Sequence, residues 1–141
     1  MNKSGPIVVI EDDLEDQEMF GDVFTEIAVQ NRILFFGDGN AAYEFLTESG
    51  EQPFLILSDI NMPRLNGFEL REKIQNNEQL RLKCIPFLFF TTSAEQKAVV
   101  TAYSRSVQGF FVKPDNYTNL KRIINNIVEY WKDCHSPNVI S

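Results

Sequence analysis

Five short apolar segments, spaced along the whole chain, constrain the fold more than any other feature. In chain order they are Ile7–Ile10, Ile33–Phe36, Phe54–Ser58, Phe87–Phe90 and Phe110–Val112. The first and the fourth contain no polar residue at all, and such a lack of alternation is typical of strands that are covered on both faces. The segments therefore predict a sheet with helices packed on each side.

Segments with helical periodicity separate these strands. Apolar residues recur at spacings of three and four within Leu14–Val29 and again within Asn116–Trp131, which predicts a helix in each. Shorter helices are indicated around Ala41–Leu46, Phe68–Ile74 and Ala94–Tyr103. This alternation predicts an α/β fold, a doubly wound five-stranded parallel sheet of the (βα)5 flavodoxin-like kind with strand order 2-1-3-4-5.

Length and charge narrow the possible functions. The 141 residues suit one domain, and the formal net charge of −7 argues against nucleic acid as the partner. The two cysteines suggest neither a disulfide framework nor a cysteine metal site. The chain begins without a signal-peptide pattern, and no apolar stretch approaches the roughly 20 residues that cross a bilayer. We therefore expect a cytoplasmic protein that does not enter a membrane.

Polar side chains stand at the ends of four of the five predicted strands. In chain order they are the acidic run Glu11-Asp12-Asp13, then Asp59, Thr91 and Lys113. The carboxyl ends of parallel strands lie along one edge of the sheet, where α/β proteins bind their ligands. Carboxylates, a hydroxyl and an ammonium at that edge suit a hard divalent cation and a phosphoryl group.

Together these stretches closely resemble the receiver domain of two-component response regulators. The matching stretches are Val8–Asp13, Ser58–Pro63 with Asn66-Gly67, Phe90–Ser93 and Val112–Pro114. The resemblance covers about residues 5–131 and leaves 132–141 as a tail, with no output domain expected. The long segment Asn76–Ile85 and the run Thr91-Thr92-Ser93 look like the stand-alone, CheY-like receivers that partner phytochrome-type sensor kinases.

The resemblance implies a phosphorylation site at Asp59. This carboxylate would accept a phosphoryl group from a sensor histidine kinase or a histidine phosphotransfer protein, forming an acyl phosphate. Thr91 would hydrogen-bond a phosphoryl oxygen, and Lys113 would pair with Asp59. An aspartate that merely caps a loop is the simpler alternative for Asp59 alone. A lysine at a buried strand end, however, requires an anionic partner.

The resemblance also implies a magnesium site. Asp12 and Asp59 would supply carboxylate oxygens, Glu11 would act directly or through a water, and Asn61 would add its backbone carbonyl. Magnesium retains several waters, so this sparse ligand set is sufficient. Acidic residues also favour the first turn of a helix, and that simpler role is the one expected for Asp13.

A switch is implied at Thr91 and Phe110. In the family, the aromatic residue at the position of Phe110 moves when the hydroxyl at the position of Thr91 moves. This movement changes the surface of the last strand and its neighbouring helices. Phe110 is equally consistent with an ordinary core residue. The Lys113–Pro114 bond is typically cis in receivers, although only about 5–6% of X–Pro bonds are cis.

Two other classes of protein remain open. A dehalogenase-like aspartyl-phosphate hydrolase also uses a strand-end aspartate, but needs a second aspartate where Asn61 stands. A degenerate receiver would bind partners without phosphate. We expect no enzymatic activity beyond autodephosphorylation. The expected output is contact with a protein partner or onward phosphotransfer, and the expected assembly is a monomer or homodimer.

Overall fold

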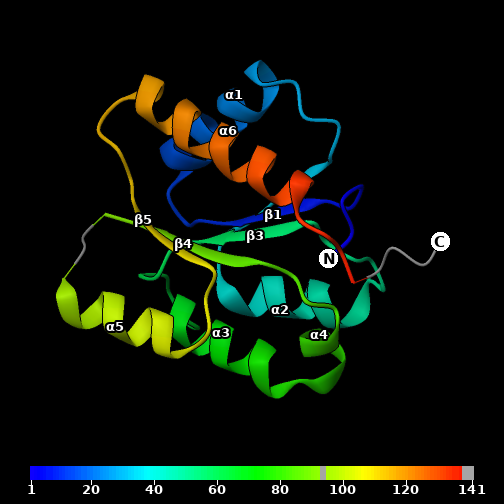
Figure 1. Ribbon diagram of the computed structural model, residues 1–141. Helices are drawn as coiled ribbons and strands as arrows, with labels where there is room; N and C mark the ends of the chain where they lie inside the picture. Colours follow the sequence, from blue (N-terminus) through cyan, green and yellow to red (C-terminus); the bar gives the residue numbers. More distant parts are fainter. Residues whose placement is uncertain (93–94, 138–141) are drawn as a thin grey trace.

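The structure is a computed structural model that describes residues 1–92 and 95–137. Its centre is a five-stranded parallel sheet in the order β2-β1-β3-β4-β5 (Figure 1). The strands are β1 (Ile7–Ile10), β2 (Ile33–Phe36), β3 (Leu55–Ser58), β4 (Phe87–Thr91) and β5 (Gly109–Val112). The predicted fold class and strand order are confirmed, and each strand differs from its predicted bounds by at most one residue.

Helices cover both faces of the sheet. They are α1 (Leu14–Glu26), α2 (Gly39–Glu48), α3 (Gly67–Asn76), α4 (Glu78–Leu82), α5 (Gln96–Ser104) and α6 (Tyr117–Asp133). The first and last pack on one face and the other four on the opposite face (Figure 1). In the part of the chain that is described, no helix has the length and hydropathy of a membrane span.

Each face of the sheet forms its own hydrophobic core. Alternate residues of one strand divide between the two cores, because successive side chains of a strand point to opposite faces. Val9 and Phe90 pack with α1 and α6, whereas Val8 and Phe89 pack with α2 to α5. All four are at most 1% exposed. The prediction that β1 and β4 are buried on both faces is therefore confirmed.

The ends of the first and last helices differ by two or more residues from the sequence-based prediction. The first helix ends at Glu26 rather than Val29, because Ala28 takes a left-handed conformation with φ of 56°. The last helix runs to Asp133, two residues beyond its predicted end. Ala94, the predicted start of the fourth helix, lies outside the described residues, and α5 is described from Gln96.

The short helix α4 was not predicted. Asn77 starts it by accepting a hydrogen bond from the backbone N–H of Leu80, and the Leu80 side chain is only 3% exposed. One apolar contact in a five-residue segment gives too little periodicity to indicate a helix. As a result, the predicted fourth and fifth helices are α5 and α6 of the structure.

Candidate functional site

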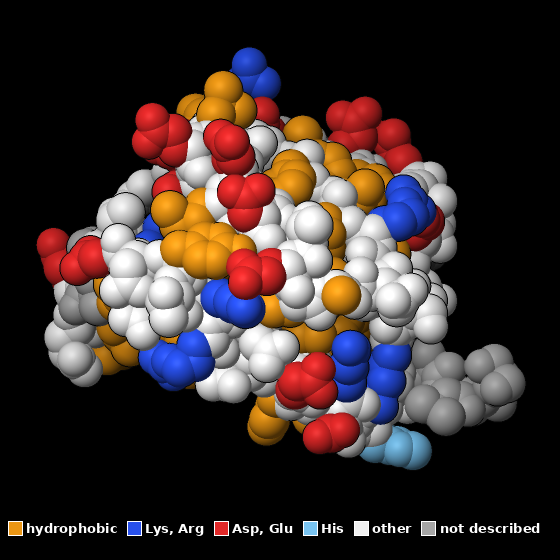
Figure 2. Space-filling model, turned by 90° about the horizontal axis from the view of Figure 1, so that it is seen from above, with side chains coloured by type: hydrophobic (Ala, Val, Ile, Leu, Met, Phe, Trp, Pro, Cys, Tyr) orange, Lys and Arg blue, Asp and Glu red, His pale blue; other side chains and the backbone are white. Residues whose placement is uncertain are grey.

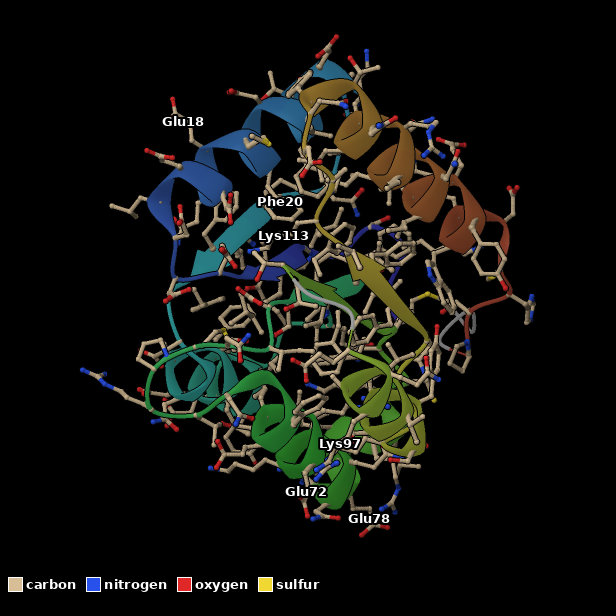
Figure 3. All side chains as sticks on the ribbon, turned by 90° about the vertical axis from the view of Figure 1, so that its left-hand side faces the viewer. Glu18, Phe20, Glu72, Glu78, Lys97 and Lys113 are labelled. Atoms are coloured by element: carbon tan, nitrogen blue, oxygen red, sulfur yellow. The ribbon has the colours of Figure 1, made fainter. Side chains whose placement is uncertain are left out.

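The register of the sheet brings the predicted site residues to one edge. Ile10 pairs with Ser58 at the ends of β1 and β3, and the backbone N–H of Asp59 donates to the Ile10 carbonyl at 2.9 Å. At the end of β4 the Thr91 carbonyl accepts from the backbone N–H of Lys113 at 2.7 Å. Figure 3 looks onto this edge, with Lys113 near its centre.

Lys113 is the electrostatic centre of the site. Its Nζ lies 2.8 Å from Glu11 Oε1, 2.8 Å from Asp16 Oδ2 and 3.2 Å from Asp59 Oδ2. Burial opposes the charge on this amine, but hydrogen bonds to Asp16 and Glu11 outweigh it and raise the pKa of Lys113. The lysine therefore stays an ammonium. It contacts three carboxylates, one just after β1, one in α1 and one just after β3.

Three carboxylates of this edge form a compact acidic cluster. Carboxylate oxygens of Glu11, Asp12 and Asp59 lie within 4.8 Å of one another. Glu11 is 2% exposed and Asp59 8%, whereas Asp12 is open to solvent. Burial raises the pKa of Glu11 to about 8, and Asp59 adds to this, while the hydrogen bond from Lys113 opposes it. The cluster is thus short of positive charge.

One oxygen of the cluster is unsatisfied. Glu11 Oε2 is buried and has no hydrogen-bond partner among the residues that the structure describes. Leaving a buried acceptor unpaired costs about 1–3 kcal/mol, and more for a charged group. Oxygen donors in this number and spacing fit a hard divalent cation such as Mg²⁺, which combines one or two carboxylates with several waters.

The start of α3 packs tightly against the backbone of Asp59. Asp59 Oδ1 accepts a hydrogen bond from the backbone N–H of Ile60 at 2.7 Å. The Ile60 carbonyl accepts one from the backbone N–H of Gly67 at 2.8 Å. A Cβ at Gly67 would stand 2.4 Å from the Asp59 carbonyl oxygen and 2.7 Å from the Phe89 ring. The start of α3 is therefore pressed directly against the strand end that carries Asp59.

Replacing Gly67 with alanine should destabilise the protein by about 1–3 kcal/mol, the usual cost of overpacking. The matched control is Gly37→Ala, because a Cβ at Gly37 meets nothing within 4 Å. Urea unfolding measures both variants. A loss of stability at Gly67 no larger than at Gly37 would show that the contact of α3 with Asp59 is not tight.

The two predicted switch residues lie on adjacent strands. Thr91 ends β4 and is 1% exposed, whereas Phe110 in β5 is half-buried. The ring of Phe110 faces the core under α2 to α5, with its centroid 6.3 Å from that of Phe89. Asn61 is exposed beside the acidic cluster, while Ser93 lies outside the described residues.

Sequence reasoning missed Asp16. It stands in the first turn of α1, where Asp13 acts as the N-cap through hydrogen bonds from the N–H groups of Glu15 and Asp16. Partial burial opposes the charge of Asp16, but hydrogen bonding with Lys113 outweighs it and lowers the pKa of this carboxyl. The sequence feature that could have indicated Asp16 is its position one helical turn beyond the acidic run. This position places it on the side of α1 that faces Lys113.

The peptide bond after Lys113 differs from the implied form. The described residues contain no cis peptide bond, so Lys113–Pro114 is trans. The trans form is the intrinsically favoured one, by about 0.5–1 kcal/mol for an X–Pro bond.

Comparison with known proteins decides the family. The response regulator receiver domain family matches residues 7–125. The chain belongs to this family. It is 32% identical over 129 residues to the probable methanogenesis regulatory protein FilR2 of Methanothrix harundinacea, covering 89% of this chain and 82% of that protein. It is 30% identical over 130 residues to response regulator Rcp1 of Synechocystis, covering 89% and 87%.

Solved receivers share the whole architecture. The phosphorylated cyanobacterial phytochrome response regulator RcpA aligns with a TM-score of 0.85 at 24% identity, covering 94% of this chain and 98% of that one. The Mn²⁺-bound form of Rcp1 aligns with a TM-score of 0.81 at 28% identity, covering 93% and 97%. The fold of this chain is therefore that of phytochrome-associated receivers.

Proposed function

We propose that this chain is a single-domain response regulator that accepts a phosphoryl group on Asp59 in a magnesium-dependent reaction. The receiver domain spans residues 5–131 and the donor is a sensor histidine kinase or a histidine phosphotransfer protein. One observation carries the proposal: Asp59 lies in a cluster of three carboxylates within 4.8 Å, with the Lys113 ammonium 3.2 Å from it. A merely structural aspartate needs neither neighbour.

The proposed reaction is a transfer from nitrogen to oxygen. A carboxylate oxygen of Asp59 forms a bond to phosphorus while the phosphorus–nitrogen bond of the donor histidine breaks, and the freed imidazole nitrogen takes up a proton. Lys113 moves its ion pair from the carboxylate to the new phosphoryl oxygens. Thr91 offers its hydroxyl to one of these oxygens from the end of β4.

Magnesium would be held by Glu11, Asp12 and Asp59, with the backbone carbonyl of Asn61 as a further ligand. When bound, it supplies positive charge that the phosphoryl oxygens need in the transition state. The unpartnered Glu11 Oε2 and the charge deficit of the cluster support this ligand set. The Mn²⁺-bound form of the relative Rcp1 supports a divalent cation as well.

The output in this proposal is a contact with a protein or onward phosphotransfer. The responsive surface is formed by α5, β5 and α6, with Thr91 and Phe110 as the switch that phosphate biases. Exposed apolar side chains already lie there, since Tyr103 is 53% and Val112 is 44% exposed. The face over α1 and α6 mixes basic side chains with acidic ones, which favours a protein over nucleic acid (Figure 2).

Acetyl phosphate with magnesium, followed by intact mass spectrometry, tests the proposed function. A receiver should show one added phosphoryl group. A dehalogenase-like hydrolase would release phosphate steadily without an adduct, and Asn61 in place of its second aspartate disfavours that outcome. A phosphate-independent receiver would show neither adduct nor turnover. Either of the last two results would refute the proposal.

A further inference from the structure

A cavity lies at the amino end of the sheet, opposite the phosphoacceptor edge. It has a volume of about 310 Å³ and opens between α3, α4, the segment leading into β4 and the last helix. Pro86, which lines it, immediately precedes β4, so the cavity stands at the amino end of a strand whose carboxyl end carries Thr91. It shares no lining residue with the site around Asp59 and Lys113. Any ligand here would be independent of the phosphoryl chemistry.

The cavity contains a buried cation without an anion. Arg71 of α3 is 6% exposed and has no carboxylate within ion-pair distance in the described residues. Its Nε donates to the Arg105 carbonyl at 3.1 Å and its Nη2 to the Ser106 carbonyl at 2.7 Å. These bonds fix the guanidinium at the C-terminal end of α5, and its Cζ lies 5.4 Å from the centroid of the Phe87 ring. Its partners are thus carbonyl dipoles and an aromatic face rather than a carboxylate. Burial accordingly lowers the pKa of Arg71.

A second arginine reaches the same cavity from α4. Arg81 is exposed, and the one hydrogen bond of its side chain to a described residue is a long one of 3.4 Å from Nη1 to the Gln75 carbonyl. It has no carboxylate partner among the described residues either. Elsewhere on this acidic chain such partners are found, as in the 2.6 Å pair of Arg32 with Glu51. Two unpaired guanidinium groups on one cavity therefore attract an anion.

The rest of the cavity wall has an apolar part and a polar part. The apolar part is formed by Ile74, Leu80, Ile85, Pro86 and Trp131, and the remainder by Gln75, Cys84, Ser106 and Gln108. A volume of about 310 Å³ is at the small end of the 300–1,000 Å³ range of ligand sites. The planar fork of a guanidinium matches a carboxylate in a two-pronged hydrogen bond. An ion without an apolar body would leave the apolar part of this wall uncovered.

We propose that this cavity binds a small amphipathic carboxylate. Its charged end lies between Arg71 and Arg81, and its apolar body lies against Ile85 and Trp131. The ligand is thus an organic acid with a short hydrocarbon body.

Titration with 4-methylpentanoate tests the proposal, with calorimetry as the primary measurement. Trp131 is the only tryptophan of the chain, so its fluorescence gives a second, local readout. We expect saturable binding of the acid and at least tenfold weaker binding of its uncharged counterpart, 4-methylpentanamide. Inorganic phosphate, which has the charge without the apolar body, should also bind at least tenfold more weakly.

Two arginine substitutions provide the matched comparison. Arg81→Gln should weaken binding of the acid at least tenfold without changing the melting temperature much, since Arg81 is exposed. Arg122→Gln is the control, because Arg122 is also exposed and lines a different cavity, whose wall it shares with Trp131. It should bind the acid as the wild type does.

Three results would overturn the proposal. One is the absence of saturable heat with millimolar 4-methylpentanoate. Another is equal affinity for the acid and its amide, which would remove the role of the charge. The third is unchanged affinity in Arg81→Gln, or an equal loss in Arg122→Gln, which would place the ligand elsewhere.

Discussion

The Asp59→Asn variant should take up no phosphoryl group from acetyl phosphate, while the wild type gains one. The asparagine side chain has nearly the same shape, so it can keep the hydrogen bond from the backbone N–H of Ile60, which is 2.7 Å long in the wild type. It lacks the carboxylate that forms the acyl phosphate. Intact mass spectrometry in the presence of magnesium measures both proteins directly.

Asp13→Asn is the matched control for this loss. Asp13 lies in the same acidic run but is exposed and caps α1, and asparagine caps a helix about as well as aspartate. This variant should label as the wild type does. Labelling of Asp59→Asn at the wild-type level would place the phosphoryl group on another side chain, and would leave Asp59 as a structural residue.

The fold was predictable because its strongest signals are local. Continuous apolar runs such as Ile7–Ile10 mark strands that are covered on both faces, and alternation with helical segments then leaves few topologies. The differences arise where tertiary structure decides. The left-handed conformation of Ala28 ends α1 early, and the buried side chain of Leu80 anchors α4. Neither feature is indicated by a pattern in the sequence.

The site was predictable only in part. Strand-end position indicated that Glu11, Asp59 and Lys113 lie together, since the edge of a parallel sheet collects such residues. Position in the sequence does not show how many anions one ammonium contacts. Asp16 joins them from the first turn of α1, which depends on how that helix packs beside β5. The arginines of the cavity at the amino end of the sheet come from α3 and from the unpredicted α4, so their place on one cavity wall was not foreseeable either.

Magnesium should raise the melting temperature of the wild type by roughly 5–10 °C. A ligand that binds only the native state adds about 2.7 kcal/mol at a hundredfold excess over its Kd, and 1 kcal/mol corresponds to about 2–4 °C in domains of roughly this size. The binding energy comes from relieving repulsion among carboxylate oxygens that lie within 4.8 Å of one another. Thermal unfolding in EDTA and in millimolar magnesium measures the difference.

The Asp12→Ala variant should lose this response and should also melt higher than the wild type in EDTA. At 4.8 Å two like charges repel by about 1 kcal/mol in water and by about 3 kcal/mol at an effective dielectric of 20. The opposing term is the attraction of Asp12 to the start of α1, worth about 0.3–1 kcal/mol. Asp12 is exposed and precedes the N-cap Asp13, so its removal costs little packing.

Asp115→Ala is the control, because Asp115 is exposed just beyond Lys113 and is not one of the three clustered carboxylates. It should keep the full response to magnesium. A wild-type melting temperature that ignores magnesium would exclude the metal site. A melting temperature of Asp12→Ala below that of the wild type in EDTA would mean that the attraction of Asp12 to the start of α1 exceeds its repulsion by the other carboxylates. Lys113 alone would then already neutralise the cluster.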